Sequence, residues 1–317
     1  VSAEYYNRKT TDMLLGYPKA TSSGFSEYNA NIGSMRNTGF EFSLGGSLIK
    51  TTDFIWNLTW MGSTVTNKVL KLTGESPEII KGVFSIKEGM PINTYYMAKS
   101  AGVDPATGAQ LYWVYDKDDN GNITNEYISS DYQKAANSKY YSGSRIPDLY
   151  GSINTDFSYK NFDLSIVVSG GFGFELANMV DQFAGNLDGV FNVYKAVDNR
   201  WKSPENPGNG RYGTTKMGTT APERDWFSSR FLYNGNYLTI KNITLGYQVP
   251  LRNRDIIKGL RAYVSFQNVY TFTSYIGANP EVNISNTGTT ANSLQQGFDY
   301  TTYPVPRTIT LGLNVNF

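Results

Sequence analysis

Hydrophobic and polar residues alternate with a period of two along several stretches of the chain. The clearest is the last, where Ile309, Leu311, Leu313, Val315 and Phe317 share one face and alternate with Thr, Gly and Asn. Successive side chains of a strand point to opposite faces, so this pattern predicts a β-strand with one apolar face. The same alternation predicts strands at 1–15, 40–48, 54–60, 149–159, 162–170, 237–249 and 260–273.

One predicted strand carries a change of phase. Leu238 and Ile240 lie on one apolar face before Asn242, whereas Ile243 and Leu245 continue it after one extra residue. A β-bulge accommodates an extra residue without reversing the faces of a strand. We therefore expect a bulge near Asn242.

The connections between the predicted strands are of two lengths. The short ones are 50–53, 160–161 and 250–259, and the long polar ones are 16–37, 66–147, 171–236 and 274–304. Short turns at one end and long loops at the other are typical of outer-membrane barrels. The direction of successive strands alternates correctly if the segment 66–147 crosses the membrane an even number of times. One such pair of crossings could be 94–103 and 109–115. The sequence thus predicts eight or ten antiparallel strands. Eight could close alone, and a larger barrel needs further strands.

Composition favours an all-β membrane protein. The chain has 24 Tyr, 17 Phe, 5 Trp and 31 Gly, and its mean hydropathy is −0.39. No stretch approaches the roughly 18 continuous apolar residues of a membrane helix. A barrel strand alternates apolar and polar residues, so a barrel protein also has a low mean hydropathy. A soluble β-sandwich is the alternative, and it would place its aromatic residues mostly in one core. Here aromatics also cluster near strand ends, as in the girdles of a barrel.

Charge and residue types restrict the chemistry. Lys and Arg number 28 against 27 Asp and Glu, which gives no reason to expect nucleic acid as a partner. His and Cys are both absent, which removes His-dependent triads, thiol nucleophiles and imidazole- or thiolate-bound zinc. We therefore expect no enzyme. The first residues form no signal peptide and already alternate like a strand, so we interpret 1–317 as part of a longer protein.

Several blocks of the sequence resemble one family when taken together and in order. The closing run YPVPRTITLGL with its terminal aromatic, and the strand YLTIKNITLGY followed by Val249-Pro250, are similar to the SusC/RagA-like TonB-dependent importers of the outer membrane. At 277–281 the chain reads GANPE where the family usually has Gly-x-Asp-Pro-Glu, so Asn279 replaces an acid. The other matching blocks are AEYY at 3–6, RKT at 8–10, NTGFE at 37–41, QN at 267–268 and TSYI at 273–276.

The resemblance implies a fold and a function. It implies that 1–317 is the C-terminal portion of a 22-stranded, plugged transmembrane antiparallel β-barrel, without the plug and the N-terminal strands. It also implies TonB-driven import of oligosaccharides or peptides with a SusD-like lipoprotein, in the outer membrane of a Gram-negative bacterium of the Bacteroidetes. The TonB complex would act through the N-terminal part. The alternatives are a siderophore or cobalamin receptor, an outer-membrane enzyme, and an adhesin or structural barrel.

One segment begins like a calcium-binding loop. Asp116, Asp118 and Asn120 occupy positions one, three and five, with Gly at six. Position twelve is Tyr127, and Glu126 comes one residue early. The sequence therefore offers a candidate calcium site at Asp116, Asp118, Asn120 and Glu126. The alternative is a polar turn between strands.

Other candidate functional residues lie outside the predicted strands or at their ends. The segment 174–201 has loosely helical spacing and is a candidate contact for substrate or for the SusD-like lipoprotein, which the resemblance implies is a lid over the barrel. Aromatic faces suit sugar rings or peptide side chains, although packing between loops explains them as well. Phe317, a terminal aromatic, is a candidate signal for barrel assembly. The aromatic residues considered as substrate or lid contacts are Trp113, Tyr115, Trp201, Trp226 and Phe227.

Overall fold

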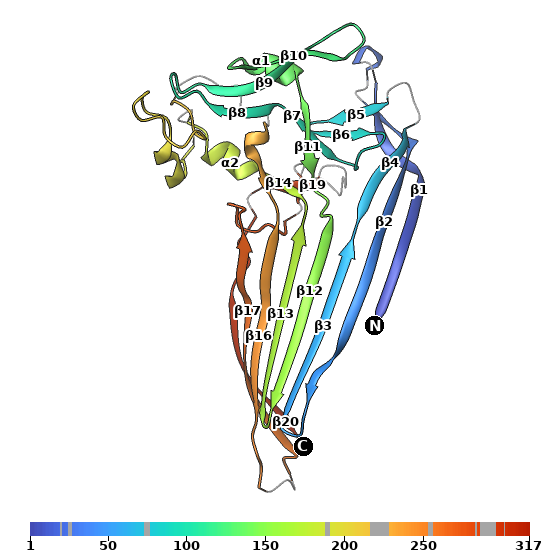
Figure 1. The fold of residues 1–317 in the computed structure, drawn as a ribbon, viewed down its shortest axis with the longest axis vertical. Coiled ribbons are helices and arrows are strands. Elements are labelled where there is room, and N and C mark those ends of the chain that lie inside the picture. Colours follow the sequence, from blue (N-terminus) through green and yellow to red (C-terminus); the bar gives the residue numbers. More distant parts are fainter. Residues whose placement is uncertain are drawn as a thin grey trace.

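A tall curved sheet with a compact group of smaller sheets at one end makes up the molecule (Figure 1). We call the long strands the wall and the structures at its upper end the cap. The cap comes from the segments 66–147, 173–236 and 274–306. The computed structural model describes residues 1–19, 21–24, 27–72, 77–187, 191–215, 228–252, 256–282, 284–285, 296–300 and 302–317.

The wall is antiparallel throughout, in the order β1-β2-β3-β12-β13-β16-β17-β20, with β4 continuing beside β2. Among the described strands β1 and β20 do not pair with each other, so the wall is an open part of a barrel. The prediction of eight long antiparallel strands is confirmed, but these eight strands do not form a closed barrel. Their bounds are β1 Ser2–Pro18, β2 Glu27–Lys50, β3 Phe54–Thr64, β4 Thr66–Leu72, β12 Leu149–Tyr159, β13 Phe162–Phe172, β16 Tyr237–Gln248, β17 Gly259–Thr273 and β20 Thr308–Asn316.

The ten-strand alternative is wrong. Its extra pair exists as the hairpin β8 Lys99–Val103 and β9 Gln110–Lys117, but this hairpin belongs to a separate cap sheet. The reason is burial. One face of β9 packs Tyr112 and Val114 into a closed core, where each is 1–2% exposed. On the other face Tyr115 is also buried, at 9% exposed, so protein covers both faces of this strand and leaves no side for lipid.

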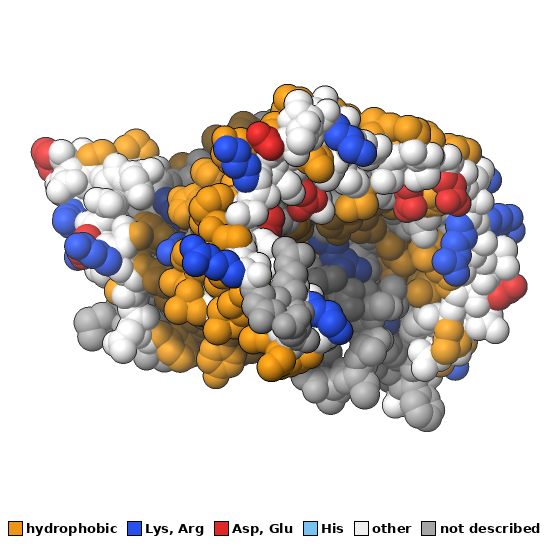
Figure 2. Space-filling model, turned by 90° about the horizontal axis from the view of Figure 1, so that it is seen from below, with side chains coloured by type: hydrophobic (Ala, Val, Ile, Leu, Met, Phe, Trp, Pro, Cys, Tyr) orange, Lys and Arg blue, Asp and Glu red, His pale blue; other side chains and the backbone are white. Residues whose placement is uncertain are grey.

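The wall's register places apolar residues in rows on one face. Trp60 pairs with Ile153, Ile153 with Val168, and Val168 with Ile240. Polar residues form the matching rows on the other face, as in the row Asn57, Asp156, Ser165, Thr244, Ser265 and Thr310. Seen from below, hydrophobic side chains gather over broad areas (Figure 2). An apolar outer face and a polar inner face are the pattern of a transmembrane β-barrel.

No helix among the described residues is long and apolar enough to cross a membrane.

The predicted bulge is present at Lys241. Asn242 pairs with Val167 and Ile240 with Val168, which leaves Lys241 as the extra residue. The extra residue brings its ammonium group to the cap loop, where Lys241 Nζ lies 2.5 Å from Glu281 Oε1. Asn279 Oδ1 accepts a hydrogen bond from the Glu281 N–H at 2.9 Å. Asn279 therefore supplies the acceptor that an aspartate would supply at this turn.

The expected long loop at 16–37 is wrong. β1 and β2 stay paired from Ser2 opposite Ser43 to Pro18 opposite Glu27, so only a short connection remains. β2 has 24 residues, or about 80 Å at about 3.3 Å per residue, which far exceeds a membrane. Its upper part pairs with β4 in the cap. A strand in this position needs no continuous apolar outer face, so alternation in the sequence does not reveal it.

The cap consists of three small sheets and short helices, as far as the described residues show. β4 and the ends of β1 and β2 lead into it. Its strands are β5 Glu78–Lys81, β6 Phe84–Lys87, β7 Thr94–Met97, β8, β9, β10 Ile123–Ser129, β11 Tyr140–Ser144, β14 Glu175–Asn178, β15 Leu232–Asn234, β18 Ile284–Ser285 and β19 Gln296–Asp299. Its helices are α1 Tyr132–Asn137, α2 Met179–Ala184, η2 Lys195–Asn199 and η4 Ser229–Phe231, and η1 Thr21–Ser23 lies between β1 and β2.

Among the described residues of the segment 174–201, helical structure is limited to α2 and η2. Leu176 belongs to strand β14 and not to a helix. The α2 helix begins where the Asn178 side chain accepts a hydrogen bond from the Asp181 N–H, and it ends at Gly185. Capping at both ends thus confines the helix to about one and a half turns, and the apolar spacing beyond it reflects packing in the cap.

Candidate functional site

Two of the predicted aromatic residues, Trp113 and Tyr115, lie on the same face of β9, where Trp113 is half-buried and Tyr115 is buried. Their neighbours Tyr112 and Val114 point the other way, into a core with Tyr132 of α1. The α1 helix is held there by Asp131, whose carboxylate accepts hydrogen bonds from the N–H groups of residues 133 and 134. Strand alternation thus fixes Trp113 and Tyr115 on the face opposite the packed helix.

Three further tyrosines from another cap sheet join this face. The rings of Tyr115 and Tyr140 lie 5.0 Å apart, and those of Tyr96 and Tyr141 lie 4.8 Å apart. Tyr96 and Tyr141 are cross-strand neighbours of β7 and β11. Together with four lysines these rings form a continuous strip, which we call the belt. Its members are Tyr96, Trp113, Tyr115, Tyr140, Tyr141, Lys87, Lys99, Lys117 and Lys139.

Each belt lysine places its ammonium group over an aromatic ring. Lys99 Nζ lies 5.3 Å from the ring centroid of Trp113 and 5.1 Å from that of Tyr140. Lys117 Nζ lies 5.0 Å from the Tyr115 centroid. The other two pairs are Lys87 with Tyr141 at 4.7 Å and Lys139 with Tyr96 at 5.8 Å. The negative face of an aromatic ring attracts a cation at such distances.

Hydrogen bonds fix the belt tyrosines. The Tyr140 hydroxyl donates to Glu126 Oε1 at 2.6 Å, and the Tyr115 hydroxyl donates to the Lys139 carbonyl at 2.8 Å. Burial raises the pKa of Tyr115, and burial followed by the bond to Glu126 raises the pKa of Tyr140. Burial lowers the pKa of Lys139. The tyrosine hydroxyls are therefore neutral donors at ordinary pH.

The candidate calcium ligands are not brought together. Asp118 Oδ1 accepts from the N–H groups of Asn120 and Asn122 at 3.0 and 2.8 Å, which is the geometry of a polar turn between β9 and β10. Glu126 instead faces Tyr140. Within the described part of the chain no group of three or more acidic, His or Cys residues could hold a metal ion. The arrangement does not fit calcium.

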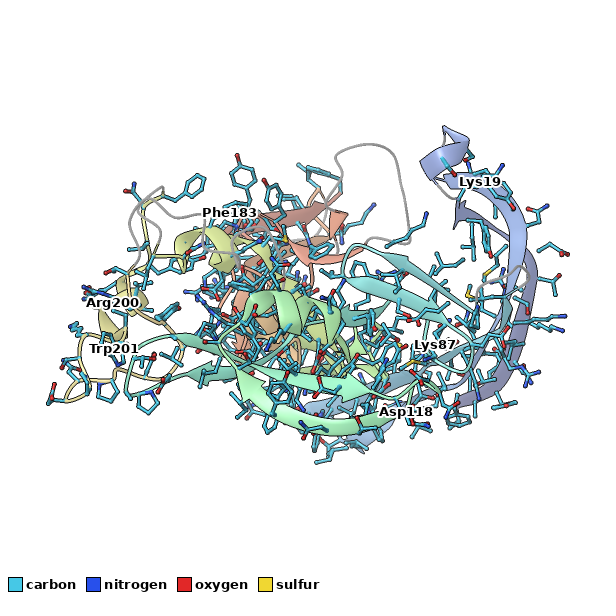
Figure 3. The ribbon with its side chains drawn as sticks, turned by 90° about the horizontal axis from the view of Figure 1, so that it is seen from above. Lys19, Lys87, Asp118, Phe183, Arg200 and Trp201 are labelled. Carbon is cyan, nitrogen blue, oxygen red and sulfur yellow. The ribbon has the colours of Figure 1, made fainter. Side chains whose placement is uncertain are left out.

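The remaining predicted aromatics lie elsewhere. Trp201 Nε1 donates to the Pro105 carbonyl at 2.9 Å, and its ring packs on Gly108, so it joins two cap loops. Viewed from above, Trp201 and Lys87 lie on different sides of the cap (Figure 3). Trp226 and Phe227 lie outside the described residues.

Phe317 follows β20 at the lower end of the wall. Its side chain is 76% exposed, and its carbonyl accepts a hydrogen bond from Lys258 Nζ at 3.2 Å. The residue thus presents a free aromatic ring, as a recognition role would require. That role stays a prediction.

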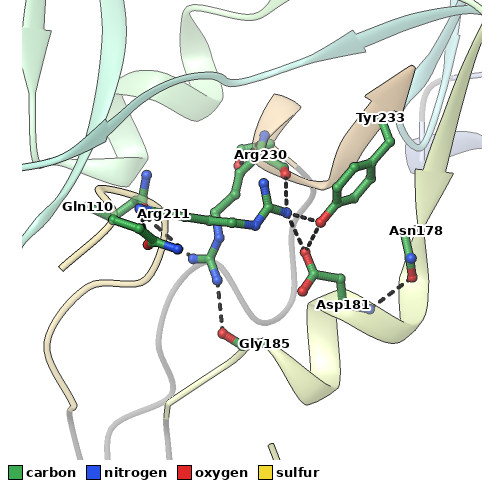
Figure 4. A network of polar contacts seen from close by, with 9 residues as sticks. Gln110, Asn178, Asp181, Gly185, Arg211, Arg230 and Tyr233 are labelled. Atoms are coloured by element: carbon green, nitrogen blue, oxygen red, sulfur yellow. Dashed lines mark hydrogen bonds and ion pairs between the residues drawn. The ribbon is translucent and has the colours of Figure 1, made fainter. Parts of the chain in front are cut away.

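A buried polar network in the cap was not indicated by the sequence. Asp181 of α2 has a fully buried side chain, and its Oδ2 accepts from Arg211 at 2.6 Å and from the Tyr233 hydroxyl at 2.5 Å (Figure 4). Arg230 donates to the Gly185 carbonyl at 2.9 Å. Burial raises the pKa of Asp181, and the two arginines oppose that rise. The network joins three segments that are distant in sequence, so no local motif reveals it.

Comparison with known proteins gives whole-length matches. No family model matches the chain. It is 32% identical over 343 residues to TonB-dependent receptor P3 of Formosa agariphila and 28% identical over 329 residues to TonB-dependent receptor SusC of Bacteroides thetaiotaomicron. These matches cover 100% and 98% of this chain, but 32% and 29% of the relatives. The chain therefore spans about a third of the length of the curated relatives it matches.

Solved structures show the same relationship. The chain is similar to the RagAB peptide transporter with a TM-score of 0.80 and 26% identity, covering 99% of this chain and 33% of that one. The relatives are named receptors and transporters, so the expectation that the chain is not an enzyme is confirmed. The rows of apolar residues on one face, the open antiparallel wall and these matches over the whole chain lead to one conclusion: the chain is a homologue, over its whole length, of one part of the SusC/RagA-like TonB-dependent receptors, and its wall corresponds to part of their outer-membrane β-barrel.

Proposed function

We propose that the chain is the C-terminal portion of an importer that moves a large nutrient across the outer membrane of a Bacteroidetes bacterium, with energy from the TonB complex. The observation that carries the proposal is the match of the open wall and its cap, over 99% of the chain, to part of a solved structure described as a peptide transporter. TonB dependence is supported by the names of the curated relatives.

The rest of the barrel, a plug and a TonB-contacting segment would belong to the other two thirds of such a protein. The open edges of β1 and β20 support this. Each unsatisfied backbone group in hydrocarbon costs several kcal/mol, so an unpaired edge across a membrane would exceed an ordinary folding free energy of roughly 5–15 kcal/mol. If residues 1–317 expressed alone gave a closed, heat-resistant monomeric barrel with β1 paired to β20, this arrangement would be wrong.

A SusD-like lipoprotein is the proposed partner at the cap, and an oligosaccharide or a peptide is the proposed cargo. The cap is built of irregular segments on a rigid wall, which is where binding residues concentrate. Trp113 and Tyr115 would contact cargo through the belt, and the segment 174–201 would contact the lid. Trp201, Trp226 and Phe227 stay candidates for either contact.

The test is deletion of the gene in its native bacterium, with growth measured on a panel of oligosaccharides and peptides as sole nutrients. We expect loss of growth on one cargo class and recovery by the intact gene, but not by a version that lacks the TonB-contacting segment. Affinity purification of the tagged receptor should recover a lipoprotein. Normal growth of the deletion strain on every cargo would contradict the import proposal.

A further inference from the structure

The belt holds more positive charge than its own carboxylates neutralise. The carboxylates that contact the belt tyrosines are those of Glu78 and Glu126, against four belt lysines. The two glutamates each accept a hydrogen bond from a tyrosine hydroxyl, at 2.9 Å from Tyr141 to Glu78 and 2.6 Å from Tyr140 to Glu126. In the part of the chain that the structure describes, none of the four lysines forms an ion pair with a carboxylate.

The rings hold these lysines in place. Lys99 and Lys117 are exposed, yet Lys99 Nζ lies 5.3 Å from the Trp113 ring centroid and Lys117 Nζ lies 5.0 Å from the Tyr115 ring centroid. The rings beneath are themselves fixed by mutual contacts and by hydrogen bonds such as that from Tyr115 to the Lys139 carbonyl. A cation that is positioned in advance loses less conformational freedom when it binds an anion.

The arrangement repeats along the belt. Ammonium groups alternate with ring surfaces from Lys87 and Tyr141 at one end, through Tyr96 and Lys139, to the Lys99 and Trp113 pair. A sugar chain with acidic substituents has the complementary alternation, because CH-rich ring faces pack on aromatics and its anionic groups accept charge-assisted hydrogen bonds. An acidic peptide would match the charges, but its carboxylate side chains would stand where a sugar presents CH-rich ring faces to the aromatics.

We propose that the belt is a cargo-binding subsite for oligosaccharides that carry carboxylate or sulfate groups. This inference rests on the proposed import function and narrows its cargo. It uses Trp113 and Tyr115, which the sequence singled out, and it assigns the lysines a role that the sequence did not indicate.

The experiment uses the full-length receptor with its lipoprotein, purified in detergent, and measures binding of three probes of equal length. These are an oligogalacturonate, a neutral malto-oligosaccharide and a poly-glutamate peptide. We expect the oligogalacturonate to bind about tenfold or more tightly than the neutral sugar, and to weaken as salt is raised. The double variant Lys99→Gln/Lys117→Gln should remove about a factor of ten of that preference.

Lys19→Gln is the matched control. Lys19 Nζ lies 5.6 Å from the Tyr28 ring centroid, in the same type of contact but at the β1–β2 connection, outside the belt. The control should bind like the native receptor. Equal affinity for acidic and neutral sugars, or an acidic preference that survives the double variant, overturns the proposal. Preference for poly-glutamate over the acidic sugar overturns it as well and reassigns the belt to peptides.

The two proposals fail separately. If the gene deletion leaves growth unchanged while acidic sugars still bind through Lys99 and Lys117, import fails and the subsite stands. If the deletion abolishes growth on a cargo while the double variant binds and imports it normally, import stands and the subsite fails.

Discussion

The wall and the cap use the same residue types in opposite ways. In the wall, Leu311 is 80% and Leu313 is 70% exposed, although both lie on a regular strand. In the cap, Ile79 and Ile86 are each 1% exposed in a closed cluster. Water penalises exposed aliphatic side chains and lipid does not. The difference therefore shows which medium surrounds each region.

Ionic groups show the same contrast. In the wall, Arg261 and Asp163 form a two-point ion pair across Gly246, with both side chains about a third exposed on the polar inner face. A Cβ atom at Gly246 would collide with both side chains, so glycine makes that bridge possible. In the cap, Asp181 is fully buried and depends on its partners. The wall thus tolerates loss of a partner better than the cap.

The largest expected effect comes from breaking the cap network. Arg211→Met removes the closest cation from Asp181, and loss of one partner of a buried pair costs about 3–5 kcal/mol, here toward the lower end because Arg230 is nearby. Hydrogen exchange should increase in 174–187 and 228–234 while the wall stays protected. The double variant Asp181→Asn/Arg211→Met should recover part of the loss. Equal protection of the native and Arg211→Met caps would contradict the contrast.

The same substitution, Ile to Ala, should cost more stability in the cap than in the wall. Ile86→Ala opens a cavity in the cap core and should cost about 2–5 kcal/mol. Ile309→Ala, at a side chain that is 67% exposed on the wall, should cost much less because lipid fills the space. Urea unfolding in lipid vesicles, followed by limited proteolysis of the cap, measures both. Similar losses at the two positions would mean that the wall face is not in lipid.

Charge insertion tests the two faces of one wall strand. Leu245→Arg puts a cation on the lipid face and should cost about 2–4 kcal/mol if the site is near the bilayer midplane. Thr244→Arg, one residue away on the polar face, should cost less. The measurement is the urea midpoint of the full-length barrel in vesicles. A larger loss of stability for Thr244→Arg than for Leu245→Arg would mean that the lipid face and the polar face have been assigned the wrong way round.

The cap should also respond to pH through Glu175. Burial raises the pKa of Glu175 from 4.5 to about 7, and Glu175 Oε2 is buried without a hydrogen-bond partner among the described residues. Because the folded cap then binds a proton that the unfolded chain releases, its stability should fall as pH rises from about 4.5 to about 7. Glu175→Gln should flatten this slope in proteolysis assays. An unchanged slope would exclude Glu175 as its source.

The smallest expected effect concerns assembly of the wall. Deletion of Phe317 should lower the amount of folded receptor in the outer membrane by about two- to fivefold, a difference of about 1 kcal/mol or less, because an exposed terminal aromatic no longer reaches the assembly machinery. Heat-modifiable mobility on gels from natively expressed cells measures the folded fraction. Phe317→Tyr, which keeps the ring, is the control and should assemble normally.

Most strands of the wall could be located from the alternation of residues along the chain. The period of two marked 149–159 with the bounds that β12 has, and a phase change at Asn242 located the Lys241 bulge. Both signals are local, because strand geometry ties each side chain to its neighbours two residues away. The same rule failed at 16–37, where the strand pairs above the membrane and no single medium imposes an apolar face.

The contacts of the cap, in contrast, come from packing between segments that are distant in sequence. The Asx turn at Asp118 looked like the start of a calcium loop, and its predicted ligand Glu126 is engaged by Tyr140 of another sheet. The belt joins β7, β9 and β11, and Asp181 meets Arg211 from a loop 30 residues away. Such contacts depend on how short sheets pack on one another, and packing between segments leaves no fixed spacing in the sequence.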